Sequence, residues 1–211
     1  MGIQERKERE REQRKQDIAD AAQKVFREKG FDRATIDDVA QRAELSKGTV
    51  YLYFKSKEEL QFAVFQRGSH LLIEMFQKAI DRNRPTQEVL LQMASVFIEF
   101  SRKHADYFEL FMFFQSSNLS KLNIEKETIE DYFYNKSPFK LVFDIVSRGI
   151  EDGTLRNDLS VDLLASTLWS QMLGLLIVLH NKKEIFHIFN VDTEEVLKSH
   201  FEIILRGALK N

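Results

Sequence analysis

Helix-breaking residues are scarce in this chain: proline occurs twice and glycine eight times in 211 residues. Because these two residues mark most turns, so few of them are poorly suited to a protein built from many short strands. Apolar residues instead recur at three- and four-residue steps, as Ile18, Ala22 and Val25 do, which is the spacing of an amphipathic helix. The chain is therefore expected to be all-α, with about nine or ten helices.

Three helix starts follow one another closely in the N-terminal quarter. Their capping residues are Thr35, Ser46 and Ser56, and each stands ahead of an apolar run. They predict two short helices over residues 36–43 and 47–54 and a longer helix from 57 to about 79.

Two short helices joined by a tight turn and braced by a preceding helix form a helix-turn-helix head. We expect this DNA-binding head over residues 13–60, with its recognition motif at about 36–55. Residues 61–211 are expected to form a larger helical body for ligand binding and dimerisation.

The second helix of such a motif enters the major groove of DNA. Around it the sequence places hydroxyls and cations that can bond to phosphate oxygens, and a glycine that lets the backbone approach closely. The candidate DNA-binding residues are Thr35, Ser46, Lys47, Gly48, Thr49, Tyr51, Tyr53 and Lys57. Singly, each of them also suits an ordinary helix surface; as a spaced set they favour DNA.

Charge is distributed unevenly along the chain. Residues 1–57 carry 14 Lys and Arg against 11 Asp and Glu, a net +3, whereas the other 154 residues carry a net −5. A basic head on an acidic body is expected if only the head meets phosphate. Signs alternate over residues 1–12, so this segment reads equally well as a solvated helix extension, and its contact with DNA stays open.

The run from Ile18 to Leu60, within about residues 13–65, resembles the N-terminal domain of the TetR family of bacterial repressors. The resemblance implies a homodimer that binds a palindromic operator and is released from it by a small molecule. The expected function is a repressor with an apolar or aromatic effector. The alternative is a helical small-molecule-binding module that no longer binds DNA. The turn departs from the family pattern, with Ala43-Glu44 where Ala-Gly is usual, and a positive φ at Glu44 would cost about 1 kcal/mol.

Aromatic residues of the body suggest where that effector binds, since ligand sites in helix bundles are lined by aromatic side chains. Plain core packing explains many of the 18 phenylalanines equally well. The candidate pocket residues are Phe97, Phe100, Tyr107, Phe108, Phe111, Phe143, Trp169 and Met172.

The segment 160–182 predicts a helix that is apolar on nearly every side, so it must be covered all round. In a small body, a second subunit most simply covers one face, with the last helix as its partner. The candidate dimer-interface residues are Leu168, Leu175, Leu179, Phe201, Ile204 and Leu205.

Other classes of site find little support in the sequence. The chain has no cysteine, so disulfides and thiolate metal sites are excluded. The five histidines are scattered and no catalytic constellation appears, so we expect no enzyme, no metal and no cofactor. Residues 1–15 are too charged for a signal peptide, and the apolar run 163–179 reads better as a buried helix than as a membrane span. A cytoplasmic protein without membrane partners is expected.

Overall fold

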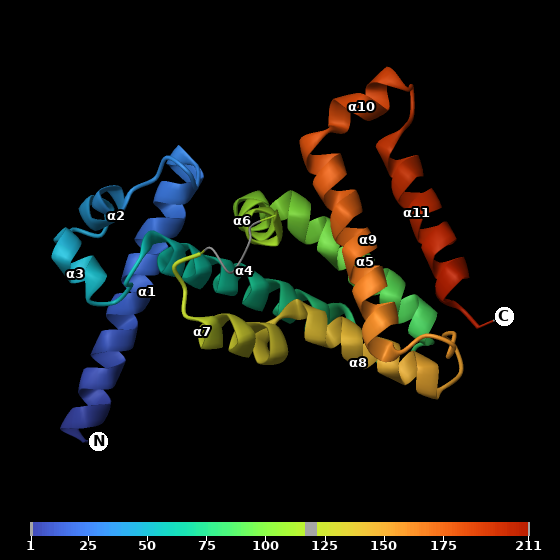
Figure 1. Ribbon diagram of the computed structural model, residues 1–211, viewed down its shortest axis with the longest axis horizontal. Coiled ribbons are helices and arrows are strands. Elements are labelled where there is room, and N and C mark those ends of the chain that lie inside the picture. The colour runs from blue at the N-terminus through green and yellow to red at the C-terminus, as the bar shows by residue number, and fades with distance from the viewer. Residues whose placement is uncertain (1, 117–121, 211) are drawn as a thin grey trace. The chain divides into compact units, whose positions relative to one another are not determined.

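The computed structural model describes residues 2–116 and 122–210. Within these residues it holds eleven α-helices and no strand, which confirms the all-α prediction (Figure 1). The helices are α1 (Ile3–Lys29), α2 (Ile36–Arg42), α3 (Lys47–Tyr51), α4 (Lys57–Ala79), α5 (Thr86–Lys103), α6 (Ala105–Ser116), α7 (Lys126–Asp131), α8 (Pro138–Glu151), α9 (Val161–Asn181), α10 (Lys183–Ile188) and α11 (Thr193–Ala208).

The helices form two compact units. The first unit is Met1–Gly68 with His104–Tyr132, and the second unit is Ser69–Lys103 with Phe133–Asn211. The predicted boundary at residue 60 falls inside α4, whereas the units divide that helix at Gly68. The first unit therefore includes α6 and α7 in addition to the predicted head.

The predicted caps of the head are confirmed. The Thr35 hydroxyl accepts a hydrogen bond from the Asp38 amide at 3.2 Å, and the Ser46 hydroxyl accepts one from the Thr49 amide at 3.0 Å. The Ser56 hydroxyl likewise accepts from the Glu59 amide at 3.0 Å. Each of these bonds satisfies an amide that has no partner within its own helix.

The turn between α2 and α3 places a non-glycine residue at a positive φ, the conformation expected to cost about 1 kcal/mol. Glu44 lies at φ 56°, the left-handed region, and the Leu45 amide donates to the Ala40 carbonyl at 2.9 Å. The helix α3 ends at Tyr51, three residues before the predicted end at Phe54. Phe54 is fully buried, so the chain turns there to bring this ring into the core ahead of α4.

The core of the first unit is aromatic. Phe65 of α4 lies 5.2 Å from Phe111 and 4.8 Å from Phe114 of α6, measured between ring centroids, and 5.1 Å from Tyr132. Phe62 lies 5.4 Å from both Phe114 and Tyr132. Contacts of this kind add to the burial of large rings and hold α6 against α4.

Gly68 lets these two helices approach closely. A Cβ added there would lie 2.8–2.9 Å from the Cβ, Cγ and Cδ1 atoms of Tyr107. The Tyr107 hydroxyl then donates to the Gln23 side chain of α1 at 2.9 Å, so α1, α4 and α6 meet at this point.

The second unit is built on α5, α8 and α9, with α10 and α11 after them. A Cβ at Gly149 of α8 would lie 2.6 Å from Leu155 and 2.7 Å from Thr86, so α8 and the start of α5 also pack through a glycine. The Arg148 guanidinium donates to the Arg82 carbonyl at 2.7 Å and to the Thr86 hydroxyl at 3.1 Å.

Two helices follow α8 largely as predicted, and one was missed. Ser160 caps α9 and Asp192 caps α11, each through its side-chain oxygen. The short helix α10 between them was not predicted; it starts after Lys182 breaks α9 at φ −133°.

Among the described residues, α9 alone is long and apolar enough to cross a membrane by length and composition. It packs against α8 and α11, as a core helix does. Only 28% of its most apolar window is buried within this chain, and Leu163 and Val178 on its surface are 53% and 41% exposed.

Candidate functional site

The predicted DNA-binding lysine on α3 is held by an acid of α2. The Lys47 ammonium donates to Asp37 Oδ2 at 2.7 Å, and this hydrogen bond raises the pKa of Lys47 above its usual value. Both side chains are more than half exposed, so water screens the pair and it contributes little stability. The cation is therefore available to a phosphate that replaces Asp37.

The hydroxyls at the two helix starts serve as caps. Ser46 Oγ lies 2.8 Å from Thr49 Oγ1 as well as accepting from the Thr49 amide. Thr35 donates from both its amide and its hydroxyl to Asp38 Oδ2, at 3.0 and 2.9 Å. Together with the Lys29 ammonium at 2.6 Å, these bonds lower the pKa of Asp38 to about 2, with the Lys29 bond the largest cause.

Gly48 has a conformation that any residue adopts. An added Cβ would find only the Ser46 hydroxyl, at the ordinary contact distance of 3.7 Å, and Gly48 is exposed. Nothing within the chain therefore requires a glycine here, although glycine costs about 1 kcal/mol in a helix. The role of Gly48 in DNA contact stays a prediction.

The aromatic candidates of this segment differ in exposure. Tyr51 at the end of α3 is 44% exposed, and the adjacent Leu52 is 75% exposed. Tyr53 is half-buried. An exposed leucine beside an exposed tyrosine is an apolar tip that suits contact with a base or sugar.

Two further lysines hold the segment after α3 in place. The Lys57 ammonium donates to the Asp32 carbonyl at 2.9 Å, and the Lys55 ammonium donates to Glu125 at 2.6 Å. The Ser56 hydroxyl donates to the Asn123 carbonyl at 2.8 Å. The structure thus brings all eight predicted DNA-binding residues to the α2–α3 motif and its flanks, with Lys57 acting within the fold.

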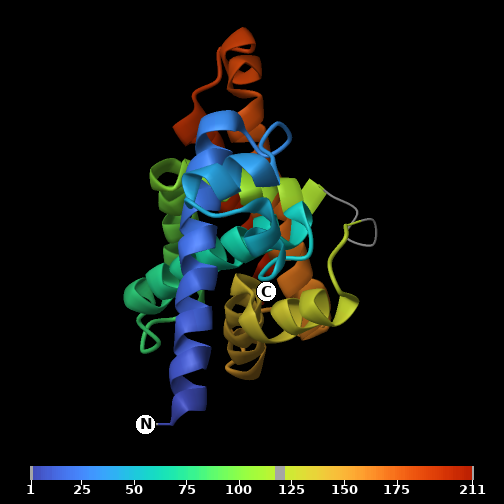
Figure 2. The same ribbon diagram turned by 90° about the vertical axis from the view of Figure 1, so that its left-hand side faces the viewer.

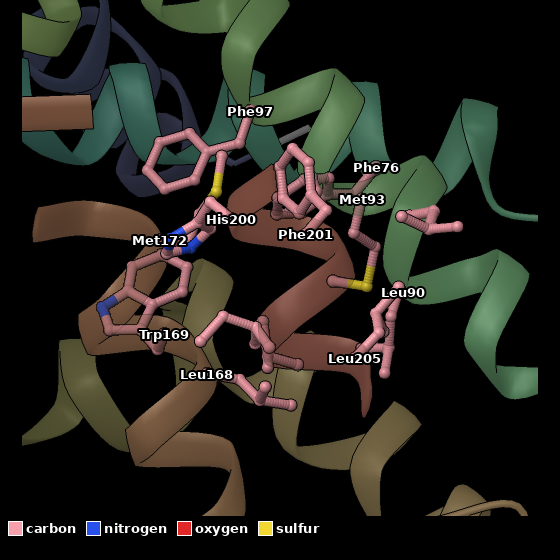
Figure 3. A pocket seen from close by; sticks show the side chains of 14 residues that line it. Phe76, Leu90, Met93, Phe97, Leu168, Trp169, Met172, His200, Phe201 and Leu205 are labelled. Carbon is pink, nitrogen blue, oxygen red and sulfur yellow. The ribbon is translucent and has the colours of Figure 1, made fainter. Parts of the chain in front are cut away.

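A second candidate site is an apolar cavity in the second unit (Figure 3). It lies between α5, α9 and α11, with contributions from α4 and α8, and its free volume is about 70 Å³. Its lining residues are Phe76, Leu90, Leu91, Met93, Ala94, Phe97, Val142, Leu168, Trp169, Met172, His200, Phe201, Ile204 and Leu205.

The cavity has two chemically different sides. Figure 3 shows Phe97, Trp169, Met172 and His200 gathered on one side and Leu90 with Leu205 on the other. Trp169 stacks on Phe97, with ring centroids 5.4 Å apart and planes 17° from parallel. Burial lowers the pKa of His200, the one ionisable side chain on the cavity wall among the described residues.

Only some of the predicted effector-pocket residues line this cavity. Phe97, Trp169 and Met172 line this cavity, whereas Phe100, which is fully buried, and Phe143 of α8 are not among its lining residues. Three others do not belong to the second unit at all, because α6 packs in the first: they are Tyr107, Phe108 and Phe111. His200 was not among the predicted pocket residues; its neighbour Phe201 was assigned to the dimer interface, so the sequence offered no signal for His200.

The predicted dimer-interface residues also lie in two different places. Leu168, Phe201, Ile204 and Leu205 face the cavity of their own chain. Leu175 and Leu179 are half-buried on α9. Among residues 2–116 and 122–210, no cluster of three histidine or acidic side chains is arranged to hold a metal ion.

Residues 18–64 match the model of a known family, described as bacterial regulatory proteins, tetR family. The chain is 30% identical over 153 residues to the HTH-type transcriptional repressor KstR2 of Mycolicibacterium smegmatis, a match covering 72% of each chain. It is 26% identical over 147 residues to the fatty acid metabolism regulator protein of Bacillus subtilis, covering 69% of this chain and 73% of the relative.

A solved structure has the same fold. The fatty acid degradation regulator FadR from Bacillus halodurans superposes with a TM-score of 0.66, covering 91% of this chain and 94% of that one. At 18% identity this likeness concerns the fold alone.

Proposed function

This chain belongs to the TetR family of DNA-binding transcriptional regulators, and we propose that it represses transcription from a palindromic operator until a small apolar molecule enters its second unit. The observation that carries the proposal is the combination of an exposed α2–α3 motif with an apolar cavity elsewhere in the same chain. We place the protein in the cytoplasm, where it meets its operator.

In this proposal α3 reads the major groove. Lys47 exchanges Asp37 for a phosphate, Gly48 lets the backbone approach the duplex, and Tyr51 reaches a phosphate or base edge with its hydroxyl. The exposed Leu52 adds apolar contact, for example with a thymine methyl group.

The test compares single variants on duplex DNA from the region flanking the coding sequence. Lys47→Ala is expected to weaken binding about tenfold without changing the far-UV helix signal. Lys55→Ala is the matched control, because Lys55 is a nearby paired lysine outside the set of residues proposed to bind DNA. Equal affinity of wild type and Lys47→Ala would remove this residue from the interface, and no salt-dependent binding of the wild type would overturn the DNA-binding role.

The effector is proposed to bind in the cavity between α5, α9 and α11. A free volume of about 70 Å³ is smaller than the roughly 300–1,000 Å³ of most ligand sites, so the cavity must enlarge. Met93 and Met172 on its wall are suited to this, because unbranched thioether side chains repack easily.

The two sides of the cavity suggest the effector's chemistry. A molecule with an aliphatic body and one polar end would set that end at His200 and its body against Leu90 and Leu205. Acyl compounds have this form, and the similarity to a regulator of fatty acid metabolism makes them the first series to test. Aromatic compounds, which would stack on Trp169, are the second series.

Filling the cavity tests this assignment. In Ala94→Phe the new ring is expected to occupy the cavity, so that ligands no longer raise the thermal midpoint or release DNA, while DNA binding itself persists. Ser95→Phe, at the neighbouring exposed position, is the control. If Ala94→Phe still responds fully to ligand, the effector binds elsewhere; His200→Ala offers a second variant should the ring prevent folding.

The protein is proposed to act as a homodimer through the uncovered face of α9. Leu163 and Val178 lie exposed there, and Gly174 faces open space, which allows a second helix to approach. A dimer places two α3 helices on two half-sites of a palindrome. Because α9 and α11 also line the cavity, a ligand that moves them would change the spacing of the two heads.

A further inference from the structure

One side of α1 continues beyond the head. Residues 7, 11, 18, 22 and 29 follow at steps of four and seven, which places them on the same side of an α-helix. Ile18 and Ala22 are fully buried on this side, and Lys29 binds Asp38 of α2 at 2.6 Å. Lys7 and Arg11 therefore lie on the side of α1 that faces the helix-turn-helix motif.

This side is cationic along the N-terminal half of the helix. At about 100° per residue, Arg14 and Lys15 flank Lys7 and Arg11. The Lys15 ammonium lies 5.6 Å from the ring centroid of Phe54, which follows α3 and fixes the direction in which this side points. We call these four residues the basic side of α1. Measured from the line through Lys7 and Arg11, Glu8 and Glu10 lie about 80° away on either side, and Glu5 and Glu12 lie at least about 120° away.

The cations of the basic side have few partners within the chain. Lys7 and Arg11 are exposed and take part in no ion pair among the described residues, and Arg14 has only Asp17 at 3.9 Å. On the opposite side, by contrast, Arg6 binds Glu10 at 2.8 Å. Both views show this half of α1 projecting beyond α2 and α3 (Figures 1 and 2).

The three lysines of the α2–α3 motif and its flank already have partners within the chain. Lys47 is shared with Asp37, Lys55 with Glu125, and Lys57 with a backbone carbonyl. We infer that the basic side of α1 binds the phosphate backbone of the same duplex that α3 reads, next to the half-site. The inference rests on the proposed DNA-binding role; charge complementarity and continuity with the α2–α3 surface identify the partner as double-stranded DNA.

A pair of double variants tests this inference. Lys7→Gln/Arg11→Gln removes two cations from the basic side, and Arg6→Gln/Arg9→Gln removes two from the opposite side. Binding of the full-length protein to the flanking duplex is measured over a series of salt concentrations. The first pair is expected to lower the slope of log affinity against log salt by about two per subunit, and the second by less than half as much. Equal changes in both pairs, or none in the first, would overturn the inference.

An insertion variant tests the same inference without changing the net charge. One alanine inserted between Glu12 and Gln13 rotates residues 2–12 by about 100° relative to the head. This replaces Lys7 and Arg11 on that side with Glu5, Glu8 and Glu12, while net charge and helix propensity are preserved. We expect it to bind DNA more weakly than Lys7→Gln/Arg11→Gln. If this variant keeps the wild-type slope of log affinity against log salt, the inference about α1 is overturned but the proposed DNA-binding role stands. If the wild type shows no salt-dependent binding, both are overturned.

Discussion

The pairing of Lys47 with Asp37 bears directly on the proposed DNA contact. Asp37 hydrogen-bonds the cation at 2.7 Å and places a negative charge beside the surface that a phosphate would approach. The two residues are ten positions apart on different helices, so no local spacing in the sequence pointed to the pair. In the proposed complex, Asp37 therefore limits the affinity for DNA that Lys47 supplies.

The Asp37→Asn variant is accordingly expected to bind DNA several-fold more tightly than the wild type, because it removes both the competing partner and the repulsion. Titration of labelled flanking duplex at one fixed salt concentration measures this. Glu28→Gln, which loses one charge beside Arg42, is the control and is expected to change affinity less. Unchanged affinity of Asp37→Asn would mean that Lys47 does not meet phosphate.

Asp38 predicts a pH dependence of stability. Its pKa is lowered from 3.8 to about 2, so the carboxylate stabilises the fold above pH 3.8, and this contribution is lost as pH falls from there to about 2. Asp38→Asn should therefore be less stable than the wild type near neutral pH, with the difference closing in that acidic window. Urea unfolding at a series of pH values measures the difference; a gap that persists at the acidic end would assign the effect to something other than ionisation.

Gly48→Ala separates folding from binding at one position. Since an added Cβ makes only an ordinary contact, the variant is expected to be as stable as the wild type or up to about 1 kcal/mol more stable. If the backbone approaches DNA here, affinity for the flanking duplex falls in the same variant. Loss of stability in urea would show that the glycine serves the fold instead.

At the scale of helices, caps were the most dependable signal in the sequence. Thr35, Ser46 and Ser56 all cap helices as predicted, because a cap depends on residues within one turn. The features that the sequence did not predict depend on tertiary packing. The early end of α3 follows from burial of Phe54, and the assignment of α6 to the first unit follows from aromatic contacts with α4. Neither leaves a local pattern, so the predicted pocket mixed residues of both units.

Two close packing contacts, at Gly68 and Gly149, are expected to depend on the absence of a side chain. Gly68→Ala and Gly149→Ala each place a Cβ within 3.0 Å of a neighbouring helix or segment, so each is expected to lose roughly 1–3 kcal/mol of unfolding free energy. Gly207→Ala is the control, because nothing lies within 4 Å of its added Cβ. Chemical denaturation measures all three, and wild-type stability in the first two would mean that the helices separate at little cost.

At the scale of the whole molecule, the proposed dimer depends on the uncovered face of α9. Val178→Asp is expected to weaken dimerisation and binding to a palindromic duplex while leaving the helix content intact, since Val178 is 41% exposed in the single chain. Tyr134→Asp, which changes a 77% exposed side chain elsewhere in the second unit, is the control. Sedimentation measures the oligomeric state; a dimer that survives Val178→Asp unchanged would place the interface on another face.

The position of Trp169 has a practical consequence. It is the single tryptophan of the chain, and it stacks against Phe97 on the cavity wall. The intrinsic tryptophan emission of this protein therefore comes entirely from the cavity, and none of it from the α2–α3 motif. Quenching or a spectral shift reports occupancy of the cavity without an added dye, while the anisotropy of a labelled duplex reports on the head. A single titration can follow both and show which of the two events comes first.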